Sequence, residues 1–324
     1  MIQTREKENR ISYAINQDRS TTYIDGRLAH FVKCTVCDSV RYQVLFTRHG
    51  FKWVQCDACG MVWVNPQLDL REIQAIYEVG YSRKHSTEWT RVKKVPLRYR
   101  WLLSKTKQYG GIKAGRVLDV GCFEGHFLNF AKSQGWEVVG TEISQPAMAF
   151  AREHLGINVE YGSLEEIGFP DSYFDLVTLN DVLEHLATPR ETLIEINRIL
   201  KPKGILYIWV PNFDSFARFL LGSSWGAVIF PWHFQYFTPM TLRKLSNETG
   251  FRVRGFSSRG LELDIHDPYE ELLSGLKRTQ DAKIVRIFKR VLERSSGLIL
   301  YGMSRLFGIH LGAHIEVFCQ KIQG

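Results

Sequence analysis

The sequence predicts an α/β protein with an open sheet of mainly parallel strands, helices on both faces, and a small N-terminal module. Three observations lead to this prediction. Arg116–His126 has the pattern of a buried strand that enters a glycine-bearing turn and then a helix. Trp136–Thr141 has the pattern of a second strand, which ends at Glu142. Two Cys-x-x-Cys pairs near the N-terminus indicate a separate module.

The composition is that of an ordinary globular protein, since 44% of the residues are hydrophobic and 23% are charged. Residues 1–10 are almost wholly polar, so we expect no secretory signal. No run approaches the roughly 20 apolar residues that cross a bilayer. These features indicate a cytoplasmic protein. The net charge of +8 is compatible with an anionic partner.

The two cysteine pairs match the pattern of a four-thiolate zinc site. The ligands would be Cys34, Cys37, Cys56 and Cys59. Two intervening residues let a tight turn direct both sulfur atoms of a pair to one ion. Residues 42–46 and 51–55 read as the hairpin of a zinc ribbon. With four thiolates the zinc would be structural, and a module this small needs such an ion for stability. The alternative is four free cytosolic thiols.

The glycine-bearing turn and the acid after the second strand predict a nucleoside site. Gly121 and Gly125 lack a Cβ, so the backbone can lie close to a bound molecule. Asp119 lies near the carboxyl end of its strand, where open α/β sheets bind ligands. Glu142 is placed to accept hydrogen bonds from the two hydroxyls of a ribose. Because Phe123 interrupts the glycines, we expect a ligand without a pyrophosphate.

The run Leu118-Asp-Val-Gly121 together with Glu142 resembles the class I S-adenosylmethionine-dependent methyltransferases. The resemblance implies a Rossmann-like sheet of seven strands with S-adenosyl-L-methionine as cofactor. Phe123 is a departure, because most of that family has glycine there. By the resemblance, the first turn wraps the methionine end of the cofactor and Glu142 holds its ribose. The expected cofactor contacts are Asp119, Gly121, Gly125, Glu142, Ile143, Ser163, Leu164, Asn180 and Tyr81.

Within that set, the resemblance gives each segment a role. Ser163 and Leu164 are expected to bind the adenine, and Asn180 to face the methionine part of the cofactor. Tyr81 would reach the cofactor from a helical cap, although packing explains this tyrosine equally well.

Two histidines are candidates for catalysis. Residues 213–239 are long and aromatic, and we interpret them as a lid over the acceptor site. His233 in this lid is a candidate general base because imidazole titrates near neutral pH; the alternative is a histidine that anchors the lid. His185 is the second candidate. A helical turn would bring Asp181, Glu184 and His185 to one face, which resembles the Glu-x-x-Glu-His motif linked to a divalent metal in ubiquinone-biosynthesis O-methyltransferases. The alternative is a motif that orders the loop without metal.

These segments divide the chain into four parts: a polar flexible arm over 1–28, a zinc ribbon over 29–68, a helical cap and linker over 69–108, and a class I methyltransferase domain over 109–324. The last part contains a helical insertion over 260–311. A basic amphipathic stripe over residues 283–294 of this insertion is expected to pack on the protein or on a second subunit; the alternative is peripheral contact with an anionic membrane.

The acceptor is predicted from a weaker signal. The run Cys-Asp-x-Cys-Gly-Met-Val-x-Val-Asn-Pro, residues 56–66, resembles methyltransferases of sugar and surface-glycan pathways, which implies a sugar or glycan-linked acceptor. An rRNA methyltransferase whose ribbon grips RNA is a second hypothesis. Against it, basic residues are scattered and no Asn/Asp-Pro-Pro-Tyr motif is present. A ubiquinone-type O-methyltransferase and a non-enzymatic docking module are further alternatives.

Overall fold

The computed structural model describes residues 21–24, 27–48, 51–69, 97–229, 232–261, 298–304 and 308–322. Several predictions from the sequence lie outside these ranges. They concern residues 1–20 of the arm, Tyr81 and most of the helical cap, and the basic stripe of the insertion. In the described part, no helix has the length and apolar character that crossing a membrane requires.

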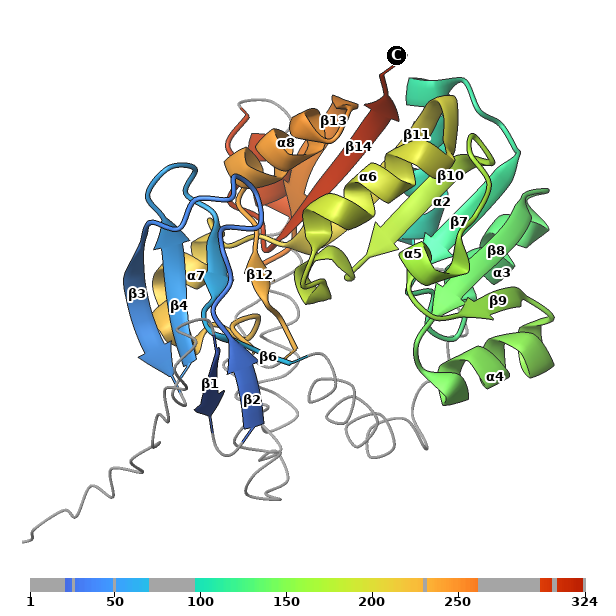
Figure 1. The fold of residues 1–324 in the computed structure, drawn as a ribbon. Coiled ribbons are helices and arrows are strands. Elements are labelled where there is room, and N and C mark those ends of the chain that lie inside the picture. The colour runs from blue at the N-terminus through green and yellow to red at the C-terminus, as the bar shows by residue number, and fades with distance from the viewer. Residues whose placement is uncertain are drawn as a thin grey trace, which may run out of the picture.

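A seven-stranded sheet forms the centre of the protein (Figure 1). Its order is β13-β14-β11-β10-β7-β8-β9, and strands β7 to β11 are parallel. Strand β14 is antiparallel to both β11 and β13. The strands are β7 (Arg116–Val120), β8 (Glu137–Glu142), β9 (Asn158–Tyr161), β10 (Phe174–Asn180), β11 (Leu200–Pro211), β13 (Phe251–Arg259) and β14 (His314–Lys321). The predicted seven-stranded α/β fold is therefore confirmed.

Both faces of this sheet are covered by helices. Side chains along a strand alternate between faces, so Val117 and Leu118 of β7 belong to two different apolar clusters. One cluster lies under α2 (Leu97–Gly110), α3 (His126–Ser133) and α4 (Gln145–Leu155). The other lies under α5 (Leu164–Ile167), α6 (Pro189–Ile199) and α8 (Pro239–Glu248). Burial on both faces explains why the central strands are almost wholly apolar.

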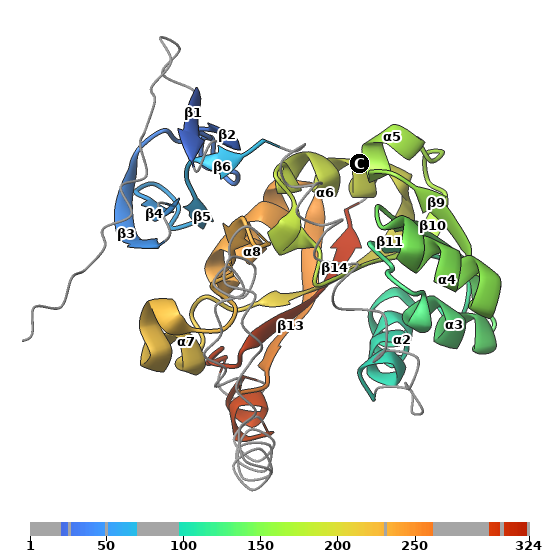
Figure 2. The same cartoon turned by 90° about the horizontal axis from the view of Figure 1, so that it is seen from below.

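The cysteine pairs lie in a second, antiparallel sheet. Its order is β12-β5-β4-β3, formed by β3 (Tyr42–Arg48), β4 (Phe51–Cys56), β5 (Val62–Val64) and β12 (Gln235–Tyr236). The predicted hairpin is present as β3 and β4. Figure 2 shows this sheet beside α8, at the end of the molecule away from α4.

Strand β12 comes from the aromatic 213–239 segment and pairs with β5 of the ribbon. Aromatic side chains of the two regions fill one apolar core, which contains Trp53, Phe213, Trp225, Phe234 and Tyr236. Residues 213–239 also include α7 (Phe216–Leu221) and a 3₁₀ turn at Gly222–Ser224. The segment predicted as a lid thus extends the sheet of the predicted ribbon. Pairing between strands so distant in sequence leaves no local signal.

A third, small sheet has the order β1-β2-β6, with β1 (Thr21–Ile24), β2 (Arg27–His30) and β6 (Gln67–Leu68). Strand β1 falls within the region predicted as a flexible arm, which is therefore too long at its C-terminal end. The β-branched and aromatic residues of 21–24 favour a strand.

Candidate active site and cysteine cluster

The candidate active site lies at the carboxyl ends of β7, β8 and β10. From β7 and β10 the sheet continues in opposite directions, to β8 and β9 on one side and to β11 and β14 on the other. Open α/β sheets bind ligands at such a reversal of strand order. Asp119, Glu142 and Asn180 are near the ends of β7, β8 and β10. The topology thus brings together three of the residues predicted to contact the cofactor.

Asp119 is fixed by its neighbours on β10. It is 4% exposed, and its Oδ1 accepts hydrogen bonds from Thr178 Oγ1 and from Asn180 Nδ2 at 3.1 Å. Burial raises the pKa of Asp119 to about 6, although these two hydrogen bonds act in the opposite direction. The Oδ1 atom of Asn180 is buried and has no hydrogen-bond partner among the described residues. It is therefore an acceptor that a ligand can satisfy.

The turn after β7 has left-handed backbone at three positions: Gly121 (φ 63°), Phe123 (φ 53°) and Gly125 (φ 75°). A Cβ on Gly121 would lie 2.8 Å from Val182, and one on Gly125 would lie 3.2 Å from Ala151. The glycines are thus required by conformation and by packing within the protein. Phe123 adopts a conformation that is uncommon for residues other than glycine.

Glu142 joins this turn to the tip of β8. Its Oε1 accepts 2.8 Å hydrogen bonds from the amides of Ile143 and Ser144, and its Oε2 accepts one of 2.8 Å from the Phe123 amide. Burial raises the pKa of Glu142, while these three amides act to lower it. Each carboxylate oxygen has two lone pairs, so Oε2 can still accept a hydroxyl. Ile143 is exposed beside it, and the Ser144 hydroxyl is buried without a partner in the described ranges.

Ser163 and Leu164, the two residues predicted to bind the adenine, make contacts within the protein. Ser163 is the N-cap of α5 and forms a capping box with Glu166. Leu164 is 2% exposed and belongs to the core cluster of Leu118. The Ser163-x-x-Glu166 spacing is a helix-start signature, and it explains both placements without a ligand.

The predicted metal group of Asp181, Glu184 and His185 does not form. Asp181 has φ 54°, so the 3₁₀ turn begins only at Leu183 and ends at His185. The Asp181 carboxylate instead faces Arg98 at 3.8 Å and His314 at 3.9 Å. Because a left-handed residue precedes the turn, Asp181 lies outside the cluster that contains Glu184 and His185.

Glu184 and the two histidines proposed for catalysis form a different cluster, in which their ligand atoms all lie within 4.8 Å of one another. His185 Nδ1 bonds to the Trp232 carbonyl at 2.6 Å, and His233 Nδ1 bonds to the Ala227 carbonyl at 2.9 Å. Burial lowers the pKa of His185 to about 4 and lowers that of His233 well below its usual value. Their catalytic roles remain predictions.

A histidine that the sequence assigned only to a strand lies at the carboxyl edge of the sheet. His314 begins β14 opposite Pro211 of β11, and its ring stacks on Trp209 with 4.9 Å between centroids. The Arg98 guanidinium also lies over the Trp209 ring, 4.7 Å from its centroid. The Arg98–Asp181–His314 group therefore follows Asn180 along the carboxyl edge of the sheet. Only the antiparallel pairing of β14 with β11 places His314 there.

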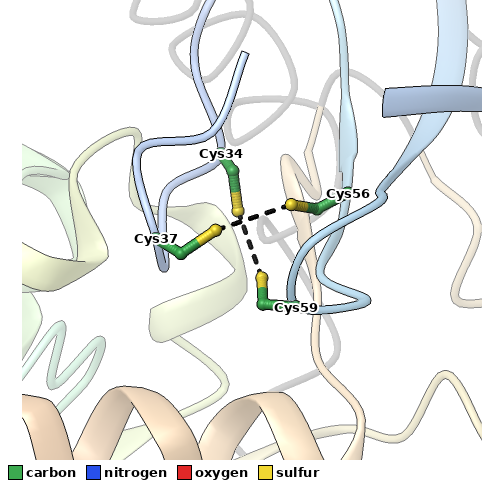
Figure 3. A group of neighbouring side chains, drawn as sticks. All are labelled: Cys34, Cys37, Cys56 and Cys59. Atoms are coloured by element: carbon green, nitrogen blue, oxygen red, sulfur yellow. Dashed lines mark hydrogen bonds between the residues drawn. The ribbon is translucent and has the colours of Figure 1, made fainter. Parts of the chain in front are cut away.

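The four ribbon cysteines point toward a common centre (Figure 3). The sulfur atoms of Cys34 and Cys59 are 3.4 Å apart, those of Cys37 and Cys56 are 3.5 Å apart, and all four lie within 4.8 Å of one another. A tetrahedron with Zn–S bonds of about 2.3 Å has sulfur atoms about 3.8 Å apart. The cluster has the dimensions of a four-thiolate metal site.

Comparison with known proteins decides the family. The model of the methyltransferase domain family matches residues 93–254, half of the chain. This chain belongs to the methyltransferase domain family. The predicted enzyme class, an S-adenosylmethionine-dependent methyltransferase, is thereby confirmed.

The sequences of its relatives align with about half of this chain. A ubiquinone biosynthesis O-methyltransferase of Aeromonas salmonicida is 27% identical over 175 residues, which cover 50% of this chain and 72% of the relative. A probable S-adenosylmethionine-dependent methyltransferase of Mycolicibacterium smegmatis is 28% identical over 158 residues, which cover 47% and 60%. The crystal structure of an Archaeoglobus fulgidus methyltransferase is similar with a TM-score of 0.45 and 23% identity, and covers 69% of this chain and 94% of that one.

Proposed function

We propose that this methyltransferase methylates a hydroxyl oxygen of a small molecule bound beside Asn180, over the carboxyl ends of β10 and β11. The observation that carries the proposal is that buried Asp119, buried Glu142 and half-buried Asn180 lie together at the reversal of strand order. The names of several relatives, ubiquinone biosynthesis O-methyltransferases, support oxygen as the acceptor atom. The sugar hydroxyl predicted from the ribbon sequence has the same chemistry, so both acceptors are tested below.

The residues at this edge fit S-adenosylmethionine. Asn180 Oδ1, which lacks a partner among the described side chains, is an acceptor suited to an ammonium group. Glu142 Oε2 and the Ser144 hydroxyl are placed for a ribose, and exposed Ile143 for the face of an adenine. Asp119 holds the Asn180 amide in one orientation through Nδ2.

When bound, the cofactor supplies a methyl group on a sulfonium, which is already a good leaving group. The protein therefore mainly has to align the acceptor oxygen with that methyl group and remove one proton. We propose that His314 accepts this proton from the acceptor hydroxyl. Its Nε2 lies 3.9 Å from Asp181 Oδ1. Burial lowers the pKa of His314, and Arg98 adds to this effect while Asp181 opposes it. The imidazole is thus neutral near pH 7 and can accept a proton.

We further propose that Cys34, Cys37, Cys56 and Cys59 bind a structural Zn²⁺. Four thiolates suit zinc and leave no coordination position for chemistry. The ion would stabilise the fold of the ribbon. The ribbon also contacts the methyltransferase domain, because Thr35 Oγ1 donates a 2.8 Å hydrogen bond to Gln235 Oε1.

The proposed function is tested by incubating the protein with radiolabelled-methyl cofactor and separate pools of quinone precursors, nucleotide sugars and RNA. Label in a small hydroxylated molecule is the expected result. Label in the quinone pool alone would favour an aromatic hydroxyl over a sugar. Label that enters RNA alone would overturn the proposal and support the rRNA hypothesis.

A further inference from the structure

Glu184 is a buried carboxylate that accepts no hydrogen bond from the described residues. The residue is 1% exposed, and neither of its carboxylate oxygens has a hydrogen-bond partner among the described residues. Burial is the main cause that raises its pKa. A buried, ionised carboxylate without hydrogen bonds is strongly unfavourable, so the group is either protonated or accompanied by a cation. Both of its oxygens are therefore available to a metal ion.

Two imidazoles lie beside Glu184 in the arrangement that metal-binding histidines have. The ring centroids of His185 and His233 are 4.7 Å apart, and His185 Nε2 lies 4.0 Å from Glu184 Oε1. Each ring uses Nδ1 for a backbone carbonyl, at Trp232 and at Ala227. Histidines that bind a metal commonly donate their second nitrogen to a carbonyl, which fixes the ring and directs the other nitrogen to the ion. In both rings the nitrogen so directed is Nε2.

We propose that Glu184, His185 and His233 bind one divalent transition-metal ion. One carboxylate and two imidazoles suit Zn²⁺ or Fe²⁺ and do not suit Mg²⁺, which prefers oxygen ligands. The ligand atoms of the three residues are within 4.8 Å of one another, so one ion can reach all of them. Three protein ligands leave at least one coordination position for water.

This site differs from the metal group predicted from the sequence. Asp181 is replaced by His233, which comes from the aromatic 213–239 segment rather than from the turn after β10. The ion would therefore connect two segments that are distant in sequence. The Phe234 amide already donates a 2.9 Å hydrogen bond to the Glu184 carbonyl, and β12 follows directly. Because β12 pairs with β5, the ion would fasten the ribbon and the 213–239 segment to the methyltransferase sheet.

The test is the metal content of the purified protein, measured by inductively coupled plasma mass spectrometry after dialysis. We expect about one equivalent in the ribbon and about one more at Glu184. Glu184→Gln and His233→Gln should each lose about one equivalent, and Cys56→Ser should lose the other. His310→Gln is the matched control, because His310 is also partly buried but bonds to Ser304 Oγ. Equal metal content in the wild type, Glu184→Gln and His233→Gln would overturn the proposal.

A second measurement uses the wild type alone, in case the variants do not fold. A thiol-specific mercurial releases the ribbon ion, and a dye that binds zinc or iron measures what remains after the protein is unfolded. An equivalent that stays bound after mercurial treatment supports the site, whereas complete release overturns it. Hydrogen exchange gives a readout independent of activity. Amides of residues 232–238 should exchange at least about 10-fold faster in Glu184→Gln than in His310→Gln.

Discussion

The Phe123 amide donates a 2.8 Å hydrogen bond to Glu142 Oε2, so the turn after β7 is fastened to the tip of β8. The same carboxylate accepts the amides of Ile143 and Ser144. Glu142 therefore shapes the nucleoside site before any ligand arrives, and a ribose hydroxyl would join hydrogen bonds that already exist.

Replacing this carboxylate should weaken cofactor binding. In Glu142→Gln an amide nitrogen would face backbone N–H groups, and one charge-assisted hydrogen bond to the ribose would be lost. We expect the Kd for S-adenosylhomocysteine to rise about 10-fold or more in isothermal titration calorimetry. Glu137→Gln on the same strand is the control, since Glu137 is exposed and pairs with Arg116. Equal affinities of the two variants would contradict this role.

Phe123 permits a test of its left-handed backbone. With φ at 53°, an L-residue is strained and glycine is not. Phe123→Gly should therefore be about 1 kcal/mol more stable than Phe123→Ala in urea unfolding. At Glu153 in α4, an ordinary helical position, Ala should instead be more stable than Gly by about 1 kcal/mol. The same order of stability at both positions would show that the turn carries no strain.

Asp119 should make stability depend on pH. Its pKa is raised from 3.8 to about 6 by burial, so the folded state binds its proton more tightly than the unfolded state does. The associated stability is complete below about pH 4 and is lost as the pH rises to about 6, by up to about 3 kcal/mol. Asp119→Asn should remove this part of the dependence. The check is the difference in unfolding free energy between the two proteins from pH 4 to 7. A constant difference would contradict it.

Removing the ribbon metal should destabilise the whole protein. Cys56→Ser should lose about one equivalent of zinc and lower the melting temperature, because the ribbon's sheet continues into β12. Cys319→Ala is the control: Cys319 is buried in β14, far in sequence from the cluster, so this variant should lose stability but keep its zinc. Loss of zinc from both variants would argue against the four-thiolate assignment.

His314 should matter for the reaction rather than for cofactor binding. If it accepts the acceptor's proton, His314→Gln should lower kcat by about 10²-fold or more while the affinity for S-adenosylhomocysteine changes little. His310→Gln, a change to another histidine near β14, should leave kcat unaltered. An unchanged kcat in His314→Gln would exclude proton removal by this ring.

Local signals in the sequence predicted the sheet and the cysteine cluster. The strands β7 and β10 are continuous apolar runs, and each Cys-x-x-Cys pair fixes its own turn, so neither needs long-range information. The placement of Asp119, Glu142 and Asn180 followed from the rule that parallel strands share a carboxyl edge.

The remaining features depend on contacts between distant residues. His314 reaches the carboxyl edge of the sheet only because β14 runs antiparallel to β11. His233 joins Glu184 only because the 213–239 segment folds over the turn after β10. Asp181 does not join Glu184 and His185 because its φ angle of 54° is left-handed. The sequence pattern of a helix does not reveal such an angle. The spacing of Ser163 to Glu166 also indicates the capping box that the structure shows, and the cofactor contact of Ser163 stays a prediction.

The pairing of β5 with β12 means that the N-terminal ribbon is not a removable attachment. A shortened protein beginning at α2 would leave the edge of β12 unpaired and expose Trp225, Phe234 and Tyr236 to solvent. Such a surface invites strand-to-strand association between molecules. The catalytic half should therefore aggregate when expressed from Leu97 onward, and gain or loss of the ribbon during evolution should require matching changes between β11 and α8.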